Sequence, residues 1–99
     1  MAEQRLTGKQ ARYLRSLGHH LDAATMVGKD GINENLVESV EEGLTAHELV
    51  KIKLQRGCPL DRHEVTEILS QKTDSAIAQI LGQTILLYRP SDKKKITLP

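Results

Sequence analysis

The chain has 99 residues and a formal net charge of +1, and it contains two tyrosines but neither Phe nor Trp. A chain of this length is expected to form a single domain, residues 1–99, with a core of Leu, Ile, Val and Ala. The one cysteine, Cys58, excludes an internal disulfide, and no Cys or His stands at zinc-ligand spacing from it. Because no leader peptide and no apolar run of about 18 residues is visible, we expect a cytoplasmic protein.

The near-neutral total hides a separation of charge along the chain. Residues 1–20 carry four basic residues against one acidic residue, whereas residues 34–48 carry five glutamates and no Lys or Arg. Residues 51–56 carry three basic residues, and residues 89–95 carry four against one acidic residue. Such a separation allows a nearly neutral protein to present one strongly positive face.

The first predicted element is a helix between Thr7 and Gly18. Thr7 and Gln10 have the spacing of a capping box, and Gly18 suits the C-terminal stop. At about 100° per residue the side chains form two arcs. The apolar arc contains Leu6, Tyr13, Leu14 and Leu17, and the basic arc contains Arg5, Lys9, Arg12 and Arg15.

An apolar run over residues 23–27 predicts a short buried strand, which residues 28–31 end. Asn33 can cap a second helix that runs to about Thr45. Its predicted buried stripe is Leu36, Val37, Val40 and Leu44, and its solvent side is Glu34, Glu38, Glu41 and Glu42. Acidic residues near the start of a helix suit the helix dipole.

The second half of the chain predicts a strand, a helix and a hairpin. Residues 48–55 alternate with period two, with Val50, Ile52 and Leu54 on one face and Leu49, Lys51 and Lys53 on the other. Asp61 and Glu64 form a capping box for a helix to about Thr73, with Val65, Ile68 and Leu69 inward. Residues 76–81 and 84–88 predict a hairpin, and Ile96 with Leu98 could add a brief edge pairing.

This order of elements, α-β-α-β-α-β-β, indicates an α/β fold. Strands separated by helices imply right-handed crossovers and parallel pairing, and the terminal hairpin adds one antiparallel strand. We therefore expect a two-layer sandwich with a four-stranded mixed sheet.

The loop Gly28-Lys29-Asp30-Gly31 lies between a predicted strand and a predicted helix. Glycines allow positive φ and close approach to a ligand, and free N–H groups at a helix start attract anions. KH modules use a GxxG loop in the same way to clamp an RNA backbone. An ordinary strand-to-helix turn is the alternative, while Walker and dinucleotide-binding glycine patterns are absent from the sequence.

The basic segments add to this signal, although each by itself could be a solvated surface. Lys93, Lys94 and Lys95 could be a flexible phosphate-contacting arm or a solubilising tail. His19, His20 and His47 have no partners at ligand or catalytic spacing. We therefore expect no enzymatic activity, no cofactor, no metal and no small-molecule substrate.

The chain resembles the bacterial YhbY proteins, the stand-alone form of the CRM (chloroplast RNA splicing and ribosome maturation) domain. The resemblance is carried by LRSLGH at 14–19, VGKDGI at 27–32, HELVKIK at 47–53, and LLYRPS at 86–91 with KITLP at 95–99. It implies a fold similar to the C-terminal domain of translation initiation factor three. It also implies association with precursors of the large ribosomal subunit and a role in ribosome assembly.

In that family the GxxG loop and nearby basic residues contact RNA. Gly28, Lys29 and Gly31 match the loop, and the resemblance assigns its basic positions to Lys51, Lys53 and Arg89. Two departures stand out. Residues 23–25 read Ala-Ala-Thr where relatives often have Pro-Val-Val, which affects strand entry. Asp30 replaces the Asn or Gly of many relatives, which should weaken phosphate attraction slightly.

The leading hypothesis is a monomeric, non-catalytic protein that binds ribosomal RNA, with no membrane partner. Its predicted RNA-binding residues are Lys9, Arg12, Arg15, Gly28, Lys29, Asp30, Gly31, Lys51, Lys53 and Arg89. The alternative is a protein–protein adaptor that docks on a ribosomal protein or an enzyme through the exposed sheet or the acidic helix.

Overall fold

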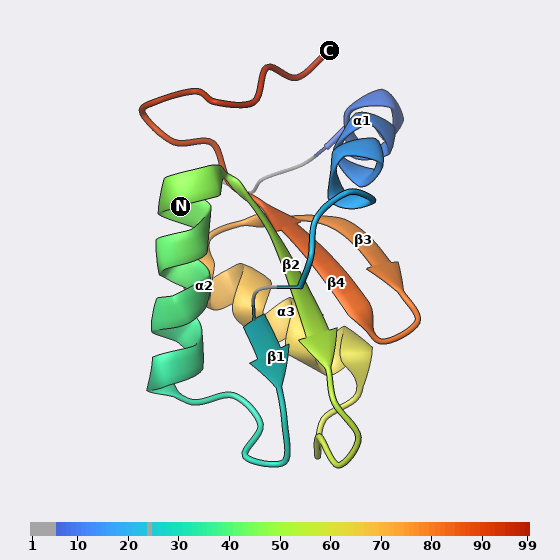
Figure 1. Cartoon of the computed structure of the whole chain (residues 1–99), viewed down its shortest axis with the longest axis vertical. Helices are drawn as coiled ribbons and strands as arrows, with labels where there is room; N and C mark the ends of the chain where they lie inside the picture. The colour runs from blue at the N-terminus through green and yellow to red at the C-terminus, as the bar shows by residue number, and fades with distance from the viewer. Residues whose placement is uncertain (1–5, 24) are drawn as a thin grey trace.

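The computed structural model describes residues 6–23 and 25–99, so the expectation for Arg5 lies outside the described residues. The elements follow the predicted order (Figure 1). They are α1 (Gly8–Gly18), β1 (Thr25–Val27), α2 (Glu34–His47), β2 (Leu49–Leu54), α3 (Arg62–Thr73), β3 (Ala76–Leu81) and β4 (Thr84–Tyr88). The α/β fold is therefore confirmed.

The four strands form one mixed sheet in the order β1-β2-β4-β3. β1 runs parallel to β2, and β4 pairs antiparallel with both β2 and β3. The prediction of one antiparallel strand is confirmed. This strand is β4, and it lies between β2 and β3. β1 pairs with β2 from Thr25 to Val27; of the rest of the predicted run, Ala23 lies outside the strand and Ala24 lies outside the described residues.

Local side chains set the helix starts where the sequence placed them. The Thr7–Gln10 and Asp61–Glu64 capping boxes both form, and the Asn33 side chain accepts from the backbone N–H of Leu36. α2 continues past Thr45 to His47. It ends there because Glu48 adopts a left-handed conformation (φ 68°) and its N–H donates to the carbonyl of Leu44 at 2.9 Å.

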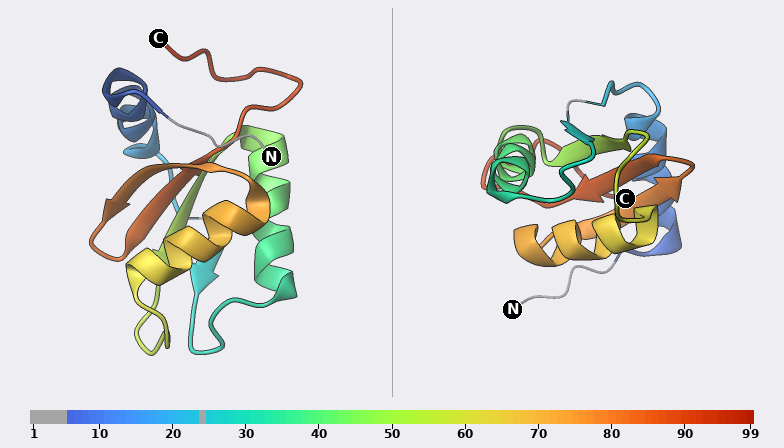
Figure 2. Two further views of the ribbon diagram at one scale, coloured as in Figure 1. Left: turned by 180° about the vertical axis from the view of Figure 1, so that it is seen from behind. Right: turned by 90° about the horizontal axis from the view of Figure 1, so that it is seen from below.

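Two apolar cores form on the two faces of the sheet. α2 and α3 cover one face, where Val40, Leu44 and Leu69 pack against Ile52 and Leu87. The sheet with α2 and α3 makes the two predicted layers. On the other face Leu14 of α1 packs with Leu49, Ala78, Leu86 and Tyr88, so α1 adds a layer that the prediction did not contain. Figure 2 shows α1 set apart from α2 and α3.

Two expectations about apolar side chains are wrong. Tyr13 is 39% exposed, because the part of α1 that faces the sheet is centred on Leu14. Ile96 and Leu98 make no strand; instead their side chains pack against the Leu14 core. The C-terminal segment thus helps α1 to cover the second face of the sheet.

Candidate nucleic-acid interface

Residues 28–31 form a tight turn between β1 and α2. The N–H of Gly31 donates to the carbonyl of Gly28 at 3.0 Å, and Gly31 has φ +65°. A side chain at this left-handed position would be strained, so the second glycine is required by the turn itself. Lys29 and Asp30 stand exposed at its tip.

A second loop, residues 55–60, lies beside this turn. A Cβ added to Gly31 would stand 3.4 Å from Cγ of Pro59, and one added to Gly57 would stand 3.9 Å from Cβ of Lys29. The N–H of Gln55 also donates to the carbonyl of Val27 at 2.9 Å. Figure 1 shows the two loops together at the bottom of the molecule. We call residues 28–31 and 55–60 the two-loop end.

A shallow groove of about 540 Å³ runs between the first loop and the start of α2. Lys29 and Asp30 both line it with opposite charges. Further positive charge at this end of the molecule comes from exposed neighbours, Lys53 on β2 and Arg56 in the second loop. Arg56 was not among the predicted contact residues, although its place in the basic segment 51–56 was a signal for it.

Two predicted RNA-binding residues, Lys51 and Arg89, make contacts within the fold. The ammonium group of Lys51 donates to the carbonyls of Gly18 at 3.3 Å and Leu21 at 3.1 Å, so it holds the C-terminal end of α1. Lys51 is half-buried. Lys51 and Lys53 lie on the same face of β2, but only Lys53 is exposed, because Lys51 is engaged with α1.

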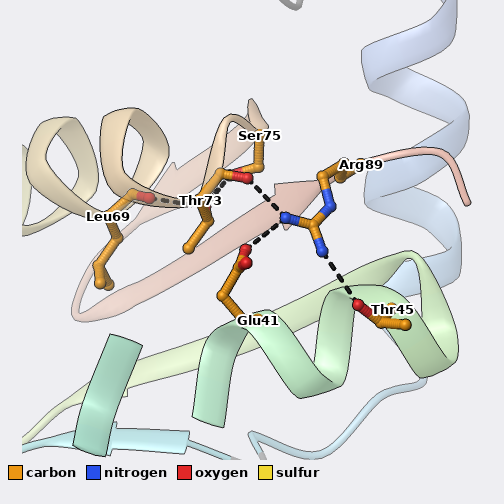
Figure 3. Close-up of polar contacts among 6 residues, drawn as sticks. All are labelled: Glu41, Thr45, Leu69, Thr73, Ser75 and Arg89. Carbon is orange, nitrogen blue, oxygen red and sulfur yellow. Dashed lines mark hydrogen bonds and ion pairs between the residues drawn. The ribbon is translucent and has the colours of Figure 1, made fainter. Parts of the chain in front are cut away.

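Arg89 lies between α2, α3 and β4, as Figure 3 shows. Its Nη1 forms an ion pair with Glu41 and donates to the carbonyl of Thr73 at 2.7 Å. Its Nη2 donates to Oγ1 of Thr45 at 3.1 Å. A guanidinium with these partners joins elements of the fold, and its side chain is only 22% exposed.

The remaining predicted basic residues, Lys9, Arg12 and Arg15, are exposed on α1. The molecule measures 37 Å along its longest axis, which is vertical in Figure 1. α1 lies at the top of that view and the two-loop end at the bottom. The structure thus divides the predicted basic surface into two separate regions.

Glu48 has a structural role that the sequence analysis did not predict. Its side chain is completely buried, and its carboxylate accepts the backbone N–H groups of Ser91 and Ile96, each at 2.8 Å, and the hydroxyl of Ser91. Burial raises its pKa, but these hydrogen bonds and one from the backbone of Lys95 outweigh burial and lower the pKa to about 2. A glutamate at a helix–strand boundary carries no local signal for this role.

The C-terminal lysines lie in the segment that Glu48 anchors. Ser91 and Ile96 bond to the same carboxylate, and the N–H of Lys94 donates to the carbonyl of Ser91 at 3.1 Å. Lys93, Lys94 and Lys95 are exposed between these two anchor points. They are therefore held in a turn rather than carried on a free arm.

Residues 6–23 and 25–99 contain no group of three or more His, Cys, Asp or Glu placed to hold a metal ion. In the same described part of the chain, none of the helices has the length and apolar character needed to cross a bilayer.

Comparison with known proteins identifies the family. The family model for the CRS1 / YhbY (CRM) domain matches residues 6–89. The chain is 43% identical to the probable RNA-binding protein YqeI of Bacillus subtilis over 95% of this chain and 99% of YqeI. It is 34% identical to an RNA-binding protein of Haemophilus influenzae, over 95% of each chain.

The fold has a solved counterpart as well. The solution structure of protein SAV1595 from Staphylococcus aureus superposes with a TM-score of 0.80 at 43% identity, over 96% of this chain and 100% of that one. The resemblance drawn from the four sequence stretches is thus confirmed by the family model and by relatives that match nearly end to end. The chain belongs to the CRS1 / YhbY (CRM) domain family.

Proposed function

We propose that this protein binds the sugar-phosphate backbone of RNA at the two-loop end. The observation that carries the proposal is the juxtaposition there of a glycine-bounded turn, the start of α2, and the exposed cations Lys29, Lys53 and Arg56. The relatives named as RNA-binding proteins support the same ligand. Amide donors and cations together suit phosphate oxygens.

Recognition at this end would be of backbone rather than of bases. Aromatic side chains are the usual platforms for unstacked bases, and both tyrosines lie elsewhere, Tyr13 on α1 and Tyr88 buried on β4. Phosphate contacts position a protein on nucleic acid without reading its sequence. We therefore expect little preference between RNA sequences of the same structure.

The cellular role we propose is association, as a cytoplasmic monomer, with large-subunit ribosomal RNA precursors during ribosome assembly. This role rests on the family resemblance and not on the geometry. Crosslinking in cells, followed by sequencing of the bound RNA, tests it directly. Enrichment of large-subunit ribosomal RNA would support the role, and recovery of other RNA alone would overturn it.

The RNA-binding proposal is tested with the double variant Lys29→Gln/Lys53→Gln. Lys53 is chosen in place of Lys51, because Lys51 holds the end of α1. We expect a loss of about four- to twentyfold in affinity at low salt, similar for all RNA sequences. The slope of log K against log salt should also become shallower by about 0.7–0.9 per lost contact.

Lys72→Gln is the matched control for that measurement, since Lys72 is an exposed lysine in the last turn of α3. Fluorescence anisotropy with a labelled RNA hairpin, measured over a series of salt concentrations, gives both the affinity and the salt slope. Unchanged affinity and slope in the double variant would place the RNA site elsewhere.

The adaptor function keeps one specific observation in its favour. Met26 and Leu81 are 51% and 66% exposed, and strand register places them in one row with Lys53 and Thr84 on the α1 face of the sheet. Exposed apolar side chains on a sheet can contact another protein. Co-purification of a protein that survives both nuclease treatment and high salt would favour this function.

A further inference from the structure

A second groove, of about 630 Å³, lies on the other side of the loop formed by residues 55–60. Its walls come from that loop, the first residues of α3 and the hairpin turn at Gln83. Gln55 also lines the groove beside the Gly28–Gly31 turn, so this residue lies between the two grooves. The second groove is therefore a neighbour of the proposed RNA site.

The charges that line this groove are mainly positive. Arg56 and Arg62 stand against one acidic residue, Asp61. The carboxylate of Asp61 is engaged within α3, where Oδ1 accepts the N–H groups of His63 at 2.7 Å and Glu64 at 3.0 Å. By contrast, the first groove has Lys29 and Asp30 with opposite charges. An anion is therefore attracted more strongly to the second groove.

Side chains rather than helix amides would hold an anion in this second groove. The capping box at the start of α3 already satisfies the N–H groups of Asp61, His63 and Glu64. Arg62 is well suited to bind an anion, because its Nη1 donates to the carbonyl of Gly82 at 3.1 Å and this bond holds the guanidinium in place. A guanidinium has five N–H donors, so this bond leaves most of them for a ligand.

We propose that Arg56 and Arg62 form a second phosphate-binding site, which takes the backbone of the RNA strand that also contacts the Gly28–Gly31 turn. The assignment rests on the proposed RNA-binding function and extends it from one loop to two grooves. Arginine is the appropriate residue because its planar fork can bind two phosphate oxygens at once.

The test uses Arg56→Gln, Arg62→Gln and the double variant, with Lys72→Gln as the control on the far end of α3. The probes are a fluorescein-labelled oligouridine and a labelled RNA hairpin, measured by anisotropy across a salt series. We expect each substitution to weaken binding by about two- to fivefold and to reduce the salt slope by about 0.7–0.9.

Conservative variants separate charge from geometry. Arg56→Lys and Arg62→Lys keep the charge but lose the fork, so the salt slope should stay near that of the wild type while affinity falls. Thermal unfolding of every variant shows whether the loss of the Arg62–Gly82 contact has changed the fold. The side chain of Arg56 makes no hydrogen bond among the described residues, so its variants test the phosphate site even if the Arg62 variants are destabilised.

Two outcomes have different meanings. If the wild-type protein bound neither probe at low salt, the proposed RNA-binding function itself would be wrong. If the wild type bound and Lys29→Gln/Lys53→Gln weakened binding, while the arginine variants behaved like Lys72→Gln, only the second site would be overturned.

Discussion

Glu48 shows how one side chain can connect distant parts of this chain. It ends α2 with a left-handed backbone, and its carboxylate anchors the segment from Ser91 to Ile96. That segment brings Ile96 and Leu98 onto the core of the second sheet face. A charged acceptor suits this site because donors from Ser91, Lys95 and Ile96 converge on one buried group.

Glu48→Gln should lower stability and change its dependence on pH. The pKa of Glu48 falls from 4.5 to about 2 on folding, so its ionised form stabilises the protein above pH 4.5, and this contribution is lost as pH falls toward 2. Replacing the carboxylate should cost about 1.5–3 kcal/mol at neutral pH. Urea unfolding over this pH range measures both effects.

Glu67→Gln is the control, because Glu67 is an exposed glutamate of α3. Its stability measured from pH 4.5 to 2 should follow that of the wild type. A Glu48→Gln protein with that same profile would show that the carboxylate contributes nothing to acid sensitivity.

At the scale of elements, the docking of α1 depends on a close approach of backbone to sheet. Leu14 is the one large side chain of α1 that is completely buried. A Cβ on Gly18 would stand 2.4 Å from Cδ1 of Leu86, so no larger residue fits there without movement. Lys51 then fastens this end of the helix through the carbonyls of Gly18 and Leu21.

Gly18→Ala should destabilise the protein even though alanine favours helix. The gain in helix propensity is about 1 kcal/mol, whereas overpacking against Leu86 costs about 1–3 kcal/mol. Gly8→Ala is the control at the other end of α1, where nothing lies within 4 Å of an added Cβ. Chemical unfolding should rank Gly8→Ala at or above wild type and Gly18→Ala below it. Equal stability of the two variants would mean that the contact with Leu86 relaxes at no cost.

At the scale of the whole molecule, exposed basic side chains gather at two ends. Lys9, Arg12 and Arg15 lie on α1, and Lys29, Lys53 and Arg56 lie at or beside the two-loop end. The two regions lie toward opposite ends of the long axis of the molecule, which measures 37 Å, whereas one Debye length at physiological salt is about 8 Å. They should therefore act as independent sites for RNA.

The triple variant with glutamine at positions 9, 12 and 15 tests this independence. We expect weaker binding of a long structured RNA that can reach both ends, and unchanged binding of a short oligouridine that occupies the two-loop end. Anisotropy with both probes at one salt concentration measures the difference. An equal loss for both probes would show that α1 belongs to a single continuous RNA surface.

The sequence by itself determined the features that depend on neighbouring residues. Helix starts were predictable because Thr7 with Gln10, Asp61 with Glu64, and Asn33 form their hydrogen bonds within one turn. β2 was predictable from the alternation of residues on its two faces, and the family from short motifs spread along the chain.

Only the tertiary structure decided which charges are exposed. Lys51 and Lys53 look alike in sequence, yet the carbonyl partners of Lys51 lie about thirty residues away, and Glu41, the ion-pair partner of Arg89, lies 48 residues away. The position of β4 between β2 and β3 is likewise a long-range pairing. Local charge and hydrophobic patterns carry no information about such distant partners, because folding brings them together through packing of the whole sheet.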